Sequence, residues 1–217
     1  HMPSSLTDQE IGAAVKPPIA DCCIPAPPVL ELDPEGKVLR SWGGPGDGYT
    51  WYSQEHGIYI DHNGFVWTGT SNGFHVMKFT QDGKLVMQIG ASNQSKGNAD
   101  TKNVHRAADV WVHPQTNEAF VADGYGNHRV IIFDADTGAF KRMWGAYGKP
   151  PTDDPNVTYD PAKPLSQNWQ TVHCATLAND GLVYVCDRVN DRIQVFKKDG
   201  TFIKEAQIAK RTLGDGV

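Results

Sequence analysis

The chain has 217 residues, 39% of them hydrophobic, and a formal net charge of −5. This length and composition are enough to bury a sizeable core. The acidic balance argues against a nucleic-acid partner, because neutralisation of phosphates dominates such binding. No apolar run approaches the ~18 residues that a membrane-spanning helix needs, so we expect no membrane partner either.

The chain divides into a proline-rich N-terminal arm over 1–28 and a repetitive region over 29–217. The arm contains six prolines and polar residues, a composition that is typical of a linker rather than of a packed domain. We therefore expect the fold to begin near Val29.

The organising unit lies in the middle of the chain. Residues 120–133 read as an apolar strand, a glycine-rich polar loop and a β-branched strand, a pattern that is typical of two antiparallel strands. With its flanks, 108–145 predicts four short strands. The same order recurs over 56–90 and over 173–205, and the last half of one more copy covers 29–43.

Each copy has a glycine in its last turn, at Gly36, Gly83, Gly138 and Gly200. These glycines recur at intervals of roughly 50 to 60 residues, which favours the four-stranded blades of a β-propeller. A β-sandwich also has many short strands, but it would not repeat their order. We predict an all-β fold, a propeller of about three and a half blades. Such an arc leaves sheet edges open, so further blades or self-association through those edges are expected.

The longest segments between the predicted strands all connect one blade to the next, over 44–55, 91–107 and 146–172. In a four-stranded blade these connections share one face with the loops between the second and third strands. Function tends to lie on loops over a rigid scaffold, so we place the site on this elaborated face.

Two histidines occupy the same repeat position, His56 and His173, directly before the innermost strand of their blades. Radially arranged blades would bring both imidazoles to the mouth of the central channel, where they could bind a metal such as zinc. Tyr125 and Arg188 lie in loops on the same face. The alternative is that the histidines are structural and that Tyr125 and Arg188 are surface residues.

Further candidates surround this group. His105, in one of the long connections, could serve as a substitute ligand, and Trp51 and Trp169 precede the two histidines closely enough to wall a pocket.

The run Asn127-His128-Arg129, followed by β-branched residues, resembles the NHL repeat of six-bladed propellers. The segments 56–61, 108–114, 122–127, 172–177 and 186–196 resemble the peptidylglycine α-hydroxyglycine α-amidating lyases. That resemblance implies a zinc-dependent propeller that cleaves the C–N bond of a peptidyl hydroxyglycine and releases a peptide amide and glyoxylate.

By position, the resemblance matches His56 and His173 to two zinc ligands, Tyr125 to the catalytic tyrosine and Arg188 to its arginine neighbour. Zinc would acidify the hydroxyl that it binds, and a cation beside a phenol would favour the phenolate. The family's third histidine and its carboxylate-binding arginine have no counterpart, so the site is expected to be incomplete within this chain.

Two other functions stay open. One is a non-catalytic propeller scaffold that binds a peptide or protein through its long loops. The other is a lactonase-type hydrolase that uses calcium, which would need carboxylates at the channel mouth. The predicted first strands begin with neutral residues or histidine there, so zinc is the expected cofactor and calcium the less favoured one.

Cys174 and Cys186 lie on the two arms of a predicted hairpin and face each other if Asp180 is in its turn. They form either a cross-strand disulfide or two buried thiols. Cys22 and Cys23 are adjacent and could pair elsewhere or bind metal. This cysteine usage favours an exported protein, secreted or periplasmic.

Overall fold

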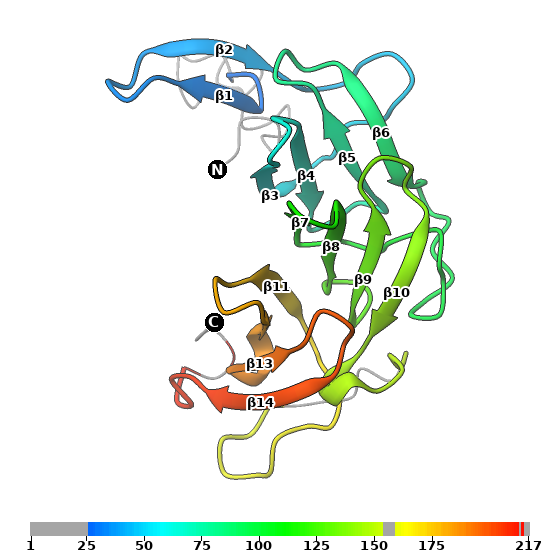
Figure 1. Cartoon of the computed structure of the whole chain (residues 1–217), viewed down its shortest axis with the longest axis vertical. Helices are drawn as coiled ribbons and strands as arrows, with labels where there is room; N and C mark the ends of the chain where they lie inside the picture. The colour runs from blue at the N-terminus through cyan, green and yellow to red at the C-terminus, as the bar shows by residue number, and fades with distance from the viewer. Residues whose placement is uncertain (1–25, 154–158, 213, 215–217) are drawn as a thin grey trace, which may run out of the picture.

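The computed structural model describes residues 26–153, 159–212 and 214. These residues form an arc of antiparallel sheets (Figure 1). The strands are β1 Val29–Leu32, β2 Val38–Trp42, β3 Glu55–Ile60, β4 Val66–Thr70, β5 His75–Phe79, β6 Leu85–Gly90, β7 Asp109–His113, β8 Glu118–Asp123, β9 Arg129–Asp134, β10 Phe140–Trp144, β11 Val172–Leu177, β12 Val183–Asp187, β13 Arg192–Phe196 and β14 Phe202–Gln207.

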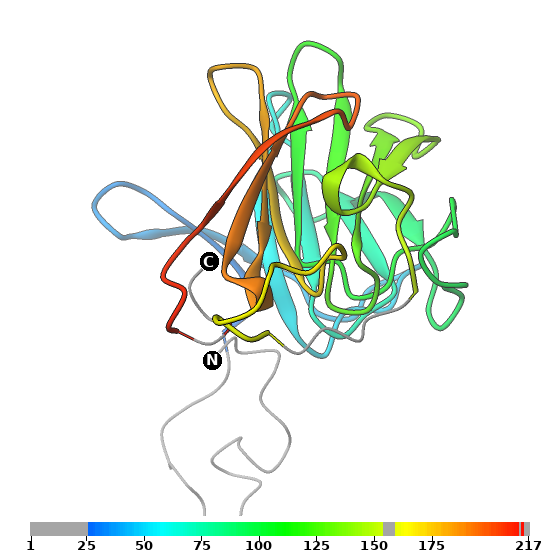
Figure 2. The same cartoon turned by 90° about the horizontal axis from the view of Figure 1, so that it is seen from below.

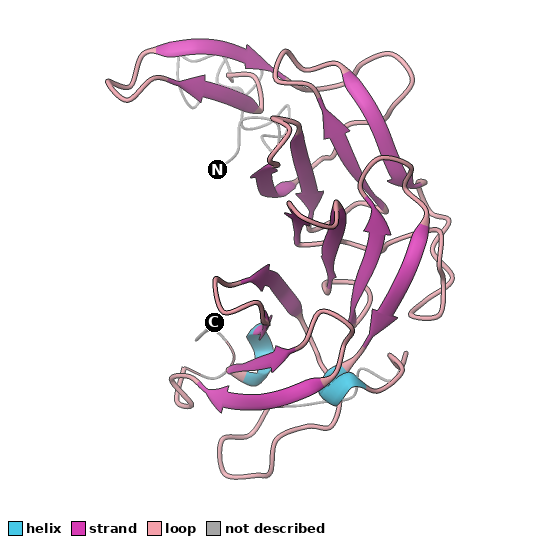
Figure 3. Cartoon of the chain, viewed as in Figure 1, coloured by secondary structure: helices cyan, strands magenta, loops and turns pink. Residues whose placement is uncertain are grey.

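Three sheets have four strands each, in the orders β3-β4-β5-β6, β7-β8-β9-β10 and β11-β12-β13-β14, and a fourth sheet pairs β1 with β2. This confirms the all-β propeller of about three and a half blades. Besides the strands, the described residues form the short 3-10 turns η3 Ala146–Gly148 and η4 Arg188–Asn190 (Figure 3). The N-terminal arm lies outside the described residues except for 26–28.

The first strand of each complete blade, β3, β7 and β11, lies on the concave side of the arc, and β6, β10 and β14 lie on its convex side (Figure 1). β7 contacts both β3 and β11. The tight turns that follow β7 and β11 extend together at one end of the molecule (Figure 2). The start of every innermost strand therefore lies at the opposite end, the elaborated face.

The core lies between neighbouring sheets. Trp67 and Val76 of one blade pack against Val121 and Ile131 of the next, and all four side chains are buried. Burial of one such side chain contributes about 1.5–3 kcal/mol, so the faces between blades hold the arc together. No helix in the described part of the chain is long and apolar enough to cross a membrane.

The repeated glycines have a packing role between blades. Gly83 and Gly200 adopt φ values of 84° and 92°, in the left-handed region that favours glycine. A Cβ on Gly83 would lie 2.7 Å from the Trp42 ring, and one on Gly200 would lie 3.0 Å from the Trp144 ring. The last turn of a blade thus needs glycine where it meets a tryptophan from the blade before it.

Glu118 and Arg142 join two strands of the second blade by a bidentate ion pair, with both N–O distances 2.8 Å. Arg142 also donates to the carbonyl of Lys198 in the following blade. The hydrogen bonds from Arg142 lower the pKa of Glu118 from 4.5 to about 2. This pair therefore stabilises the fold above pH 4.5, and its contribution is lost as the pH falls from there toward 2.

We expect Glu118→Gln to lower the free energy of unfolding at neutral pH by about 1–2 kcal/mol, because one charge-assisted bidentate pair is lost. The difference from the wild type should shrink as the pH is lowered below 4.5. Urea unfolding at a series of pH values measures this, and a difference that stays constant with pH would contradict it.

Candidate functional site

Both candidate histidines lie at irregularities in the innermost strands. The pairing of β3 with β4 shifts register between Glu55 and Ile58, and that of β11 with β12 shifts between Val172 and Cys174. His56 and His173 lie within these shifts, each as the second residue of its strand rather than directly before it. A β-bulge commonly re-aims a side chain, and here both imidazoles turn toward the same point.

The structure brings three of the four predicted site residues together. The Nε2 atoms of His56 and His173 are 3.2 Å apart, although the residues are separated by 117 positions in the chain. The Tyr125 hydroxyl lies 3.1 Å from Nε2 of His56 and 3.0 Å from Nε2 of His173. All three side chains are half-buried. Their metal-binding and catalytic roles remain predictions.

The hydrogen bonding of His56 fixes its tautomer. Its Nδ1 lies 2.9 Å from the carbonyl oxygen of Ala108, and a carbonyl can only accept, so Nδ1 carries the proton. In the neutral ring, Nε2 then presents its lone pair to the cluster. A carbonyl behind a histidine is the usual arrangement that orients a metal ligand.

His173 is favoured in its neutral form. Burial lowers its pKa, and the nearby His56 and Arg188 lower it further. Well above pH 6.5 the ring is neutral in folded and unfolded chains alike. Below that value the unfolded chain takes up a proton that the folded site resists, so acid disfavours the folded arrangement.

The separation of the two nitrogens fits a shared tetrahedral zinc. Zinc–nitrogen bonds of about 2.0–2.1 Å at a tetrahedral centre place two ligand nitrogens about 3.3 Å apart. The observed 3.2 Å is close to this value. Within the described residues, however, no group of three or more His, Cys, Asp or Glu side chains is arranged to hold a metal. The chain supplies two nitrogen donors and a phenol.

Arg188 begins η4, directly after β12. Its backbone N–H donates to the carbonyl of Thr171, 2.9 Å away, which places it beside the segment that leads into His173. Its charge lowers the pKa of His173, so the guanidinium acts on the cluster electrostatically. The predicted pairing of Arg188 with Tyr125 remains a prediction.

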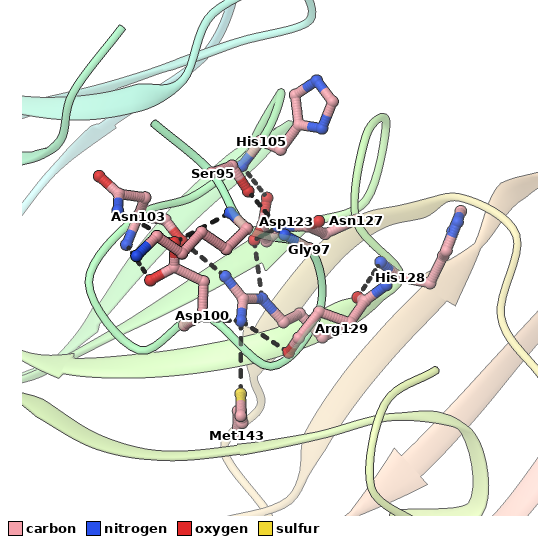
Figure 4. A network of polar contacts seen from close by, with 12 residues as sticks. Ser95, Gly97, Asp100, Asn103, His105, Asp123, Asn127, His128, Arg129 and Met143 are labelled. Carbon is pink, nitrogen blue, oxygen red and sulfur yellow. Dashed lines mark hydrogen bonds and ion pairs between the residues drawn. The ribbon is translucent and has the colours of Figure 1, made fainter. Parts of the chain in front are cut away.

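A buried carboxylate fixes the loop that carries Tyr125 (Figure 4). Asp123, the last residue of β8, accepts hydrogen bonds from Arg129 Nε at 2.8 Å, Asn127 Nδ2 at 2.7 Å and the backbone N–H of His105 at 2.8 Å. Arg129 in turn donates to the carbonyls of Asn98 and Asn103. These hydrogen bonds hold the loop 123–129 and the connection 91–107 against the blade formed by β7 to β10.

The third blade repeats this arrangement. Asp187 accepts from Arg192 Nε at 2.9 Å and from Asn190 Nδ2 at 2.7 Å. It also accepts from the backbone N–H groups of Gln170 and Thr171, directly before β11. Asp187 thus positions the segment that leads into His173. The sequence pattern indicated only that these Asn and Arg residues belong to the repeat, although the order Asp, Asn, Arg, with Asn and Arg two residues apart in both blades, could have revealed the role.

Three further candidates do not join the cluster. The His105 ring stacks on Phe74, with centroids 4.5 Å apart and planes 9° apart. Trp51 and Trp169, expected to wall a pocket, are buried in the packing between sheets. The Trp169 indole N–H donates to Gln194 Oε1, which explains its inward orientation.

Cys174 and Cys186 form a disulfide between directly paired residues of β11 and β12. The bonded alternative therefore holds in this structure, and it joins the strand of His173 to its neighbour. Cys22 and Cys23 lie outside the described residues.

No protein-family model matches the chain. It is 31% identical over 180 residues to peptidyl-glycine alpha-amidating monooxygenase A of Xenopus laevis, covering 82% of this chain and 17% of that protein. It is 30% identical over 182 residues to NHL repeat-containing protein 3 of Homo sapiens, covering 80% and 46%. It is 29% identical over 143 residues to a probable peptidyl-alpha-hydroxyglycine alpha-amidating lyase of Caenorhabditis elegans, covering 65% and 36%.

Among solved structures, a streptogramin B lyase superposes with a TM-score of 0.53 at 17% identity, covering 82% of this chain and 47% of that one. At this identity the likeness concerns the fold alone. The radial four-stranded sheets and their repeated loops define an NHL-type β-propeller. Its homologues include the amidating monooxygenases, an amidating lyase and NHL repeat-containing protein 3. The chain spans less than half the length of each of these three relatives.

Proposed function

We propose that this propeller carries the metal-binding part of a lyase site that acts on a peptidyl α-hydroxyglycine or a similar hydroxylated substrate. The observation that carries the proposal is the axial cluster: two imidazole Nε2 atoms 3.2 Å apart, with a tyrosine hydroxyl within hydrogen-bonding distance of both. The C. elegans relative, whose name specifies this lyase activity, adds support.

In the proposed reaction His56 and His173 would hold zinc, and the bound ion would supply Lewis-acid chemistry that makes the substrate hydroxyl more acidic. Tyr125 moves the proton: its phenolate oxygen takes the hydroxyl proton, and its hydroxyl returns a proton to the nitrogen that leaves. The C–N bond breaks as the C–O bond becomes a carbonyl, so an amide and glyoxylate result without a redox partner. The carbonyl of Ala108 holds His56 in the tautomer that this role needs.

A scaffold that binds a peptide or protein is the second candidate. NHL repeat-containing protein 3 is as similar to this chain as the amidating enzymes are, and only two histidines of the described residues meet Tyr125 in the cluster. Calcium fits the cluster less well than zinc, because calcium prefers oxygen ligands and the converging donors are mainly nitrogens.

The predicted location and self-association also remain proposals. The Cys174–Cys186 disulfide is consistent with an exported protein, secreted or periplasmic. On the concave side, β3 exposes Ile58 and Ile60, which are 56% and 60% accessible. These residues would be covered if another chain or further blades lay across the arc.

Metal analysis tests the proposal most directly. Purified protein is incubated with zinc, dialysed and analysed for bound metal, and then assayed for glyoxylate release from a peptidyl α-hydroxyglycine. We expect about one zinc per chain, and binding of less than about a tenth of an equivalent would favour the scaffold. Glyoxylate release measures the lyase reaction separately, since an incomplete ligand set could bind metal without turnover.

A further inference from the structure

A cavity opens at the end of the molecule opposite the axial cluster, where the turns that follow β7 and β11 extend together (Figure 2). Its volume of about 450 Å³ lies in the usual range for sites that bind small molecules. The lining comes from Trp111 and His113 of β7, the turn residues 114–116, the segment 177–179 with Gly181, and Lys198 in the last turn of the third complete blade. We call this space the turn-side cavity.

Two aromatic rings of β7 turn toward this cavity. Trp111 and His113 lie on the same side of the strand, because successive side chains of a strand alternate between its two faces. That side faces the third complete blade, since Trp111 packs against the core cluster that contains Val172 and Val185. The His113 ring is buried and lies edge-on to Trp111, with centroids 5.8 Å apart. Trp111 and Leu177 are half-buried and give the cavity an apolar wall.

The hydrogen bonds of His113 fix the position of its proton. Its Nδ1 lies 3.0 Å from the backbone nitrogen of Thr116, and a backbone N–H can only donate, so Nδ1 is the acceptor. In the neutral ring the proton is then on Nε2, which becomes a donor. Burial, followed by the nearby charge of Lys198, lowers the pKa of His113 and so favours the neutral ring.

This donor faces a second one. The Nζ atom of Lys198 lies 3.5 Å from Nε2 of His113, and an ammonium group can only donate. The two groups therefore direct hydrogens toward each other instead of forming a hydrogen bond. The backbone of Lys198 is held in place, because its carbonyl accepts from Arg142 Nε at 2.9 Å. An acceptor placed beside both nitrogens would satisfy the two donors at once.

The acidic residues of the surrounding turns do not supply that acceptor. Glu118 is bound by Arg142 through both of its oxygens. Asp180 accepts from the Tyr184 hydroxyl and from a backbone N–H of its own turn, and Asp199 accepts from a backbone N–H of its turn. Within the residues that the structure describes, no carboxylate forms an ion pair with Lys198. The positive charge at the cavity is therefore not neutralised by the chain itself.

We propose that the turn-side cavity is a second binding site and that it takes a carboxylate carried by an apolar group. One carboxylate oxygen accepts from Nε2 of His113 and the other from Lys198, whose flexible stem lets the ammonium group follow the ligand. The apolar group lies against Trp111 and Leu177. An ionised acceptor makes hydrogen bonds roughly twice as strong as a neutral one, so the charge of the ligand decides its affinity. The site shares no residue with the axial cluster and does not depend on the proposed lyase function.

The test titrates hydrocinnamate and its uncharged amide, hydrocinnamamide, into metal-stripped protein and follows the binding by heteronuclear NMR. We expect the acid to bind at least about tenfold more tightly than the amide and to shift the indole N–H signal of Trp111. Acetate has the charge without the apolar group and should bind at least about tenfold more weakly than hydrocinnamate. Equal affinities for the acid and the amide, or for hydrocinnamate and acetate, would overturn the proposal, as would an unshifted Trp111 signal.

Variants assign the binding to the two donors. Lys198→Gln should abolish the preference for the acid, whereas Lys197→Gln, an exposed neighbour in the same turn that does not line the cavity, should change the affinity less than about threefold. His113→Phe keeps an aromatic ring without the N–H and should weaken binding of the acid about tenfold or more. Equal losses from the two lysine variants, or none from Lys198→Gln, refute the site, and Lys198→Gln decides the matter if His113→Phe does not fold. His173→Ala should bind hydrocinnamate as the wild type does, so a failure of the zinc site is seen separately.

Discussion

Replacing His173 with alanine is expected to lower the affinity for zinc at least about 100-fold, because one of two nitrogen donors is lost from a site with few ligands. The remaining donor, Nε2 of His56, cannot hold the ion tightly alone. Competition with a chromogenic zinc chelator measures the affinity. Tyr125→Phe should keep the metal and lose glyoxylate release, since it removes the hydroxyl that lies within reach of both imidazoles.

His62→Ala provides the matched control. His62 is exposed in the turn after β3, outside the cluster, so its loss should leave the zinc affinity unchanged. Thermal unfolding without metal shows whether each variant is folded. Equal zinc affinities for the wild type and His173→Ala, both folded, would refute the metal site, and equal losses from His62→Ala and His173→Ala would show that binding is nonspecific.

The second large effect is expected from Asp123→Asn. Asp123 and Arg129 are both fully buried, and the substitution leaves the guanidinium without its counterion. Loss of one partner of a buried ion pair costs about 3–5 kcal/mol, because the remaining charge stays desolvated. The hydrogen bonds from Asn127 and His105 would also weaken, so the Tyr125 loop should loosen.

Urea unfolding of the wild type and the variant measures this cost, and hydrogen exchange over 123–129 measures the loop. Asp47→Asn makes the same chemical change at an exposed position and should alter stability by less than about 0.5 kcal/mol. A destabilisation by Asp123→Asn no greater than that of Asp47→Asn would show that Arg129 is stabilised mainly by its bonds to backbone carbonyls.

The repeat could be predicted from the sequence because each blade is built from short local sequence patterns. Alternating strands, polar turns and the glycine that a left-handed turn requires recur at Gly83, Gly138 and Gly200, and all three have positive φ. The partial propeller followed from these patterns. The face on which His56, Tyr125 and His173 lie also followed, because strand order fixes which ends of a blade meet.

The details of the site depended on contacts between distant segments. The β-bulges at His56 and His173 arise from pairing with neighbouring strands, and no residue type marks them. The positive φ of Arg106 and its approach to Tyr125 across the boundary between blades also have no signature in the sequence. Likewise, Asp123 and Asp187 appear as ordinary charged residues until the structure shows both to be buried.

The sequence by itself determined the blade pattern, the number of strands and the pair of equivalent histidines, since these depend on hydrophobic alternation and turn chemistry within short segments. Only the tertiary structure decided that the Nε2 atoms of two imidazoles 117 residues apart lie 3.2 Å from each other, with a phenol hydroxyl within hydrogen-bonding distance of both. The packing of one blade against the next sets such distances, and no local pattern carries that information.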